Sequence, residues 1–217
     1  MGQCCSLIQR FLPSLEMELG NSTGNSTSDA DQFAIDSVPQ AHSIDTAMSA
    51  PSITLAGDLM NEVCGNGLAL ADVPVEQDRA YWEWRVKMVN PGSSGACSTL
   101  IFGVSNKRNS KFYEILAEST VPASKHGTKF MCPVSNLKDG DVVGVLVQQS
   151  EIPMIQLYLN GEVLSGGQIS KFRGTVFPSV YLPPGSATAT FLYAKDHFVR
   201  GPPRLGFEPL MAERSIM

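Results

Sequence analysis

The sequence predicts an all-β fold: an antiparallel two-sheet β-sandwich preceded by a disordered N-terminal tether. Short runs of alternating or β-branched apolar residues recur after Ser52, and Gly, Pro and Asn residues separate them. No helical period of comparable strength interrupts these runs. Several short strands with turn residues between them are typical of an antiparallel sandwich or barrel.

The clearest predicted strand covers residues 81–89, YWEWRVKMV. Trp82 and Trp84 fall on one face of such a strand, and Glu83 and Arg85 fall on the other, which predicts one face in the core and one in solvent. Similar runs predict further strands at residues 99–105, 141–149, 155–160, 175–182 and 187–193. The aromatic residues expected in the core are Trp82, Trp84, Phe102, Tyr158, Phe177 and Tyr181.

Local sequence also specifies two turns. Asn160-Gly161 directly after a predicted strand is a strong signal for a two-residue hairpin. Asp139-Gly140 supplies residues that tolerate positive φ just before another strand, and the Asp141 carboxylate is expected to satisfy backbone amides near this turn. Pro178 cannot donate to a sheet ladder, so it is expected at a strand start, a bulge or an edge.

The distribution of charge separates the front of the chain from its body. The formal net charge is -5, yet residues 1–60 hold seven acids against Arg10 as their one base. From about residue 19 to 50 the chain is rich in Ser, Thr, Asn, Asp and Gly, and such a composition cannot bury enough surface to offset backbone ordering. We therefore expect a lipid-anchor segment at 1–18, a disordered acidic linker at 19–52, a folded domain at 53–200 and a C-terminal tail at 201–217 that packs on the domain or trails it.

The first six residues, MGQCCS, match the pattern M-G-x-x-x-[ST], in which Gly2 is myristoylated after removal of the initiator Met. One myristoyl chain binds a membrane only marginally, with a partition constant on the order of 10⁴ M⁻¹, so stable anchoring needs a second signal. Arg10 is the one cation close by, so that signal is expected to be palmitate on Cys4 and Cys5. The expected location is the cytoplasmic face of a membrane. The alternative, two unmodified cysteines, would leave a cytoplasmic pool.

No recognisable catalytic or metal-binding pattern is present in the sequence. His42, His126 and His197 take part in no HxxxH, HxE or CxxC spacing, and five cysteines at unpaired positions fit neither a disulfide framework nor a zinc site. A pairing of Cys132 with His126 stays open, although a buried inert thiol is the commoner outcome in a strand-like FMCPV run. We expect no enzyme activity, no metal and no cofactor, and the acidic net charge argues against a nucleic-acid partner.

Five short motifs, taken in order, resemble a SPRY (B30.2-like) domain. They are YWE at 81–83, FGVS at 102–105, DGDVVGV at 139–145, LYLNG at 157–161 and FRGTVFPSV at 172–180. The resemblance covers about residues 53–200. It implies a β-sandwich whose variable loops bind a peptide or protein partner without catalysis.

The function expected from these observations is that of a monomeric, non-catalytic, membrane-tethered adaptor that binds a protein or peptide partner. Two loops, 105–112 and 121–129, are the richest in basic side chains, and these are Lys107, Arg108, Lys111, Lys125, His126 and Lys129. If the loops adjoin, they would form a basic rim suited to an acidic peptide; otherwise they are ordinary solvated turns. The second hypothesis is a glycan- or small-ligand-binding sandwich, which requires an open aromatic cleft instead of a sealed core.

Overall fold

The computed structural model describes residues 44–89, 99–105, 129–170, 172 and 174–211. The chain divides into two units, residues 1–38 and 39–217, and every described residue lies in the second. Within the described ranges the regular structure is all strand except for one short 3-10 helix, η2 (Lys195–His197). The predicted all-β class is confirmed. No described helix is long and apolar enough to span a bilayer.

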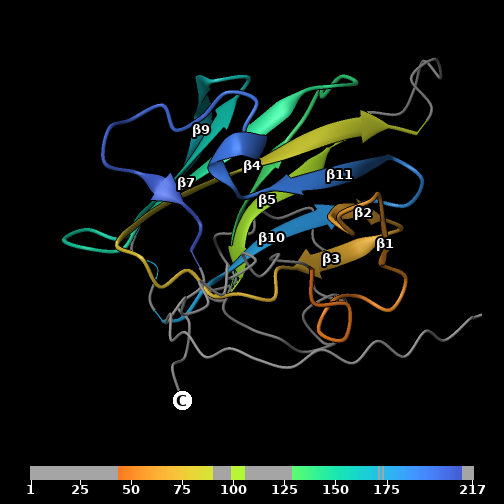
Figure 1. Cartoon of the computed structure of the whole chain (residues 1–217). Coiled ribbons are helices and arrows are strands. Elements are labelled where there is room, and N and C mark those ends of the chain that lie inside the picture. The colour runs from red at the N-terminus through yellow and green to blue at the C-terminus, as the bar shows by residue number, and fades with distance from the viewer. Residues whose placement is uncertain (1–43, 90–98, 106–128, 171, 173, 212–217) are drawn as a thin grey trace, which may run out of the picture. The chain divides into compact units, whose positions relative to one another are not determined.

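The described strands form two sheets (Figure 1). In spatial order, the larger sheet contains β1 (Thr54–Ala56), β2 (Glu62–Cys64), β11 (Ala187–Leu192), β4 (Arg79–Met88), β7 (Val142–Gln148), β8 (Met154–Leu159) and β9 (Glu162–Ser170). A short strand, β12 (Glu208–Pro209), pairs parallel with the start of β4. The smaller sheet contains β3 (Gly67–Leu70), β10 (Phe177–Leu182), β5 (Leu100–Ser105) and β6 (Lys129–Val134). All neighbours along these two orders are antiparallel.

All six strands that the sequence predicted are present, as β4, β5, β7, β8, β10 and β11, and each lies within two residues of its expected bounds. The FMCPV run is part of β6. The sequence did not predict β1, β2, β3, β9 or β12. Four of these have only two to four residues, too few to establish a period, and β9 (EVLSGGQIS) is mostly exposed and polar and contains two glycines.

One hydrophobic core lies between the two sheets. Trp82 and Trp84 of β4 are 0% exposed, and the ring of Trp84 stacks on Phe191 of β11 at a centroid distance of 4.7 Å. Phe102 enters the same core from β5. These three aromatic residues lie where the sequence predicted them.

The other three predicted core aromatics lie on the outer faces of the sheets. Tyr158 is buried with Tyr81 and Leu146 on the far side of the larger sheet. Phe177 and Tyr181 are only partly buried, and they pack on the far side of the smaller sheet. The cause is the two-residue period of a strand: Val180 and Leu182 of β10 point into the core, so its odd-numbered residues point away from it.

The turns behave as the sequence predicts. Asn160 and Gly161, between β8 and β9, have φ values of 54° and 90°, the positive region that a tight hairpin turn requires. Asp141 accepts a hydrogen bond from the backbone N–H of Lys138 at 2.7 Å. Its other carboxylate oxygen accepts from the Asn160 side chain at 2.9 Å, so the two predicted turns are joined to each other.

The folded domain begins at least nine residues before its predicted start at residue 53, because residues 44–52 pack along β3. The backbone N–H groups of Asp45 and Ala50 donate to Leu70 and Leu68 of that strand, and Ile44 and Ala50 are buried. The sparse apolar residues among polar neighbours gave no period from which this contact could be predicted. The remainder of the predicted linker and the lipid-anchor segment lie outside the described residues.

The two borders of the larger sheet are short or irregular. At one border, β1 has only three residues. At the other, β9 pairs with β8 through Tyr158–Val163 and Gln156–Gln168, so residues 164–167 lie opposite Leu157 alone and form a bulge. The thiol of Cys132 in β6 donates to the carbonyl of Gly166 in this bulge at 3.4 Å, which links the bulge to the smaller sheet.

Candidate functional site

An open groove of about 360 Å³ lies on the outer face of the larger sheet, over β2, β11 and β4. The β1–β2 turn contributes four of its lining residues, the three strands contribute four that form its floor, and η2 contributes one side chain. The lining residues are Gly57, Asp58, Leu59, Asn61, Glu62, Arg85, Thr190, Leu192 and His197. The floor of the groove is therefore built from paired strands, which hold its side chains in fixed positions, and the turn forms its side.

The floor of the groove carries opposite charges on two strands. In the sheet ladder Glu62 of β2 pairs with Thr190 of β11, and Thr190 pairs with Arg85 of β4. Paired residues point to the same side of a sheet, so this row presents an acid, a hydroxyl and a cation in that order. The Thr188 hydroxyl donates to Glu62 Oε1 at 2.7 Å and orients the acid. Among the described residues Arg85 forms no ion pair, and it is exposed.

The β1–β2 turn presents apolar side chains beside these charges. Leu59 and Met60 are each 53% exposed, whereas Leu192 on the floor is buried. The turn is fixed to β11, because the Asn61 side-chain amide donates to the Phe191 carbonyl at 3.0 Å and the Phe191 N–H donates back to the Asn61 carbonyl at 2.8 Å. These apolar side chains offer a partner contact area next to the charged floor of the groove.

A buried carboxylate holds η2 and the chain after it against the sheet. Glu83 of β4 is 0% exposed, although the strand period places it on the face predicted to meet solvent. Glu83 Oε2 accepts from the Val199 N–H at 2.6 Å, and Oε1 accepts from the N–H groups of Arg200 at 3.0 Å and Gly201 at 2.7 Å. Three successive backbone amides thus satisfy the charge of Glu83, which makes its burial tolerable.

Tyr81, which lies on the same strand as Glu83, also contacts the buried carboxylate and the segment after η2. Its hydroxyl donates to Glu83 Oε1 at 2.9 Å, and its ring meets Phe198 edge-on at 5.2 Å. Burial and then the neighbouring Glu83 charge raise the pKa of the Tyr81 phenol well above its usual value, so the phenol stays protonated and can donate. Phe207 is buried in the same outer cluster and Phe198 packs against it, so these two side chains cover the part of the sheet face over β4, β7 and β8.

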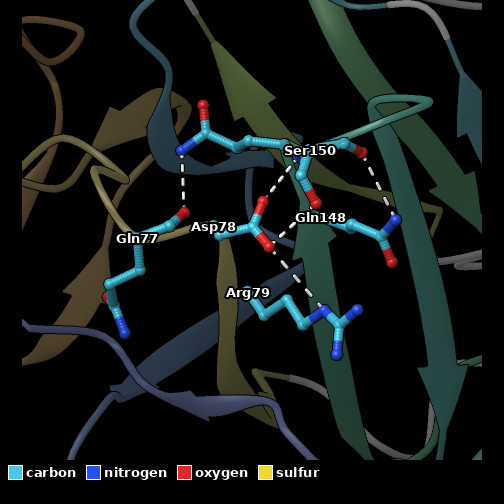
Figure 2. A network of polar contacts seen from close by, with 6 residues as sticks. Gln77, Asp78, Arg79, Gln148 and Ser150 are labelled. Atoms are coloured by element: carbon cyan, nitrogen blue, oxygen red, sulfur yellow. Dashed lines mark hydrogen bonds and ion pairs between the residues drawn. The ribbon is translucent and has the colours of Figure 1, made fainter.

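A second polar network fixes the end of the sheet (Figure 2). Asp78 accepts hydrogen bonds from the backbone N–H of Ser150 at 2.6 Å and from its hydroxyl at 2.8 Å. The Gln77 side chain donates to the Pro209 carbonyl and accepts from the Met211 N–H, both at 2.8 Å. This network joins β4, the β7–β8 turn and the C-terminal segment, and its role is structural.

The residues predicted as functional lie almost wholly beyond the described ranges. The lipidation residues Gly2, Cys4 and Cys5 lie outside them, as do the basic residues Lys107, Arg108, Lys111, Lys125 and His126. Lys129 is the first residue of β6, and its backbone is paired with Ser105, the last residue of β5. The two basic loops thus start and end at one rung of the smaller sheet, and the basic rim itself stays a prediction.

The described residues contain neither a metal-binding cluster of side chains nor a cysteine whose pKa is lowered. No described group of three or more His, Cys, Asp or Glu side chains is arranged to hold a metal ion. Burial raises the pKa of the Cys132 thiol, and burial and then the Glu62 charge raise that of Cys64, so both thiols are less nucleophilic at neutral pH than an exposed cysteine. Trp82 and Trp84 are sealed in the core and no described Trp, Tyr or Phe lines the groove, so this groove is not the open aromatic cleft that the glycan-binding hypothesis requires.

Two facing antiparallel sheets, with the five motifs on β4, β5, the turn into β7, β8 and its hairpin, and β10, define a SPRY-like β-sandwich. The resemblance predicted from the motifs is confirmed by curated relatives. The chain is 28% identical over 157 residues to SPRY domain-containing protein 7 of Homo sapiens, which covers 71% of this chain and 76% of that protein. It is also 28% identical over 166 residues to the Gallus gallus protein of the same name. SPRY domains are generally protein-interaction modules.

No family model matches the chain. Among solved structures, the chain is similar to the SPRY domain of human HERC1, with 12% identity and a TM-score of 0.49 over 69% of this chain and 96% of that one. It is also similar to the TRIM65 PSpry domain, with 11% identity and a TM-score of 0.48 over 70% of this chain and 89% of that one.

Proposed function

We propose that the protein is a non-catalytic adaptor that binds a protein partner through the groove over β2, β11 and β4, and that N-terminal lipids hold it at the cytoplasmic face of a membrane. The observation that supports binding is the groove itself. It presents a cation that forms no ion pair with another described residue, an oriented acid, and exposed apolar side chains on the adjoining turn. A pocket of this size accepts a few side chains of an extended segment, which is how most binding energy is concentrated at protein interfaces.

The anchor follows from the chain's own first residues. Myristate on Gly2 with palmitate on Cys4 and Cys5 supplies the two signals that stable attachment needs. If residues 6–18 of the anchor segment and residues 19–43 of the predicted linker form one flexible chain, these 38 residues place the domain roughly 31 to 37 Å from its anchor on average. The groove would then be accessible to partners near the membrane surface. The basic residues of the 105–112 and 121–129 loops extend the partner surface in this proposal.

Filling the groove is expected to abolish peptide binding without unfolding the domain. Thr190→Trp places a large side chain on the groove floor, at a strand position where aromatic residues are well tolerated. The probe is a displayed library of random 12-residue peptides, selected on the immobilised full chain. Peptides enriched on the wild-type protein should bind Thr190→Trp at least tenfold more weakly.

The matched control for this experiment is Val163→Trp. Val163 is 59% exposed on β9, at the far border of the same sheet. This variant should bind the selected peptides as the wild-type protein does. If peptides are enriched but bind Thr190→Trp unchanged, or if no peptide is enriched at all, the groove is not the partner site.

The anchor is tested separately in cells that contain N-myristoyl transferase. Gly2→Ala should lose the acyl mass and move from the membrane fraction to the soluble one. Cys4→Ser combined with Cys5→Ser should keep myristate but bind only weakly, since one acyl chain gives marginal attachment. Gln3→Ala leaves the recognition pattern intact and serves as the control. Retention of the Gly2→Ala protein on membranes would show that myristate is not the anchor.

A further inference from the structure

We propose that the groove binds a polyproline-II segment in which a basic and an acidic residue stand three positions apart, the basic one facing Asp58 and Glu62 and the acidic one facing Arg85. This inference rests on the proposed function, because it assumes that the groove is the partner site. It adds the conformation and the charge spacing of the bound segment.

The spacing follows from the sheet. Glu62 and Arg85 lie on β2 and β4, which are separated by one strand, β11. Neighbouring strands are about 4.8 Å apart, so the two side chains leave the sheet roughly 10 Å from each other. A ligand that meets both charges must cross the strands and carry its own opposite charges at about that distance.

Among the common peptide conformations, polyproline II spans this distance with the shortest segment. In an extended β segment, side chains on one side are separated by about 6.7 Å or 13 Å, so neither spacing fits. Polyproline II has three residues per turn and a rise of about 3.1 Å, which puts residues i and i+3 on one side at about 9.3 Å. An α-helix reaches about 10.5 Å only between residues i and i+7, so it needs eight residues where polyproline II needs four.

The chemistry of the groove between the charges suits the same conformation. A polyproline-II backbone makes no internal hydrogen bonds, so its carbonyls are free to accept from the protein. Thr190 lies between Glu62 and Arg85 and offers a hydroxyl at the midpoint. The exposed side chain of Leu59 beside the acidic end offers an apolar contact for a proline ring.

Neighbouring charges strengthen the polarity of the groove. Asp58 lines the groove from the β1–β2 turn, next to the acidic strand. Lys87 follows Arg85 by two residues on β4, so it points to the same face and adds positive charge on the basic side. A segment with its charges reversed over the groove would meet like charges at both ends, which is a source of selectivity.

The test uses proline-rich nine-residue peptides that carry one Lys and one Glu two, three or four positions apart, in both orders along the chain. Affinities for the full-length protein are measured by fluorescence anisotropy at low salt. One order with a spacing of three should bind at least tenfold more tightly than the spacings of two and four. Its affinity should fall as salt is added, since the charges are partly exposed.

A charge exchange provides the decisive measurement. Asp58→Arg and Glu62→Arg combined with Arg85→Glu and Lys87→Glu reverse both ends of the groove. This variant should make the opposite order of Lys and Glu the preferred one. Glu151→Arg combined with Arg204→Glu exchanges two exposed charges elsewhere and should leave the preference unchanged. Equal binding at all spacings, or the same preferred order after the groove exchange, would overturn this inference. If the library peptides still bind Thr190→Trp more weakly than the wild-type protein in that case, the proposed function stands and only the proposed charge spacing is wrong.

Discussion

Replacing Glu83 with Ala should release the C-terminal segment from the larger sheet and lower the free energy of unfolding by about 3 kcal/mol or more. The variant leaves the Val199 and Gly201 amides and the Tyr81 hydroxyl without the acceptor that they share in the buried interior. Each buried donor left unsatisfied costs about 1 to 3 kcal/mol, and partial detachment of the segment limits the sum. Glu83→Gln should also destabilise the protein, because its amide group presents hydrogens to backbone N–H groups.

Urea unfolding gives the stability change, and limited trypsin digestion reports the release of the segment. Arg200 and Arg204 are exposed residues in that segment, so cleavage there should accelerate in both variants. Glu76→Gln removes an exposed carboxylate and should change stability by no more than about 0.5 kcal/mol. A Glu83→Ala protein as stable and as resistant to trypsin as wild type would show that the segment is held by its apolar contacts alone.

Gly144→Ala should destabilise the domain by about 2 to 3 kcal/mol. A Cβ atom at Gly144 in β7 would overlap the hydroxyl of Tyr81 on the neighbouring strand. That ring cannot move aside easily, because its hydroxyl is hydrogen-bonded to Glu83 and the ring packs against Phe198 in a T-shaped pair. The added methyl group therefore strains the outer cluster even though alanine is otherwise acceptable in a strand.

A double-mutant cycle identifies this cause. Tyr81→Phe removes the overlapping hydroxyl, so the cost of Gly144→Ala should be smaller in the Tyr81→Phe background. Gly161→Ala is the control, since its added Cβ would meet no atom within 4 Å and its cost, about 1 to 2 kcal/mol, comes from the positive φ alone. Its effect should add to that of Tyr81→Phe within about 0.5 kcal/mol. If the effects of Gly144→Ala and Tyr81→Phe on the free energy of unfolding are additive, the clash is excluded.

The strands that the sequence predicted are those whose own residues carry a period or a dense β-branched run. In β4 the tryptophans alternate with charged residues, and in β7 the sequence VVGVLV is apolar throughout. By contrast, β2 has only three residues, and β9 contains two glycines and is mostly exposed and polar. These two strands form because neighbouring strands pair with them, and their own residues show no clear strand preference.

The candidate site was not predictable from the sequence for a different reason. Glu62, Thr190 and Arg85 come from three strands far apart in the chain, and only the ladder register places them in one row. Glu83 was assigned to a solvent-facing side, since a strand period cannot show that a segment more than one hundred residues later will cover it. The one local signal of this buried pair was that Glu83 follows Tyr81 by two positions, so that both side chains lie on the same face of β4.

The bulge in β9 and the three-residue length of β1 bear on how molecules of this protein behave when crowded. A straight unpaired border strand is a template on which a second copy can extend the sheet, and this is a common start of fibrous aggregation. Here neither border of the larger sheet offers such a template. On a membrane, where the proposed lipids would confine many copies to two dimensions, this geometry would disfavour extension of the larger sheet from one copy to the next.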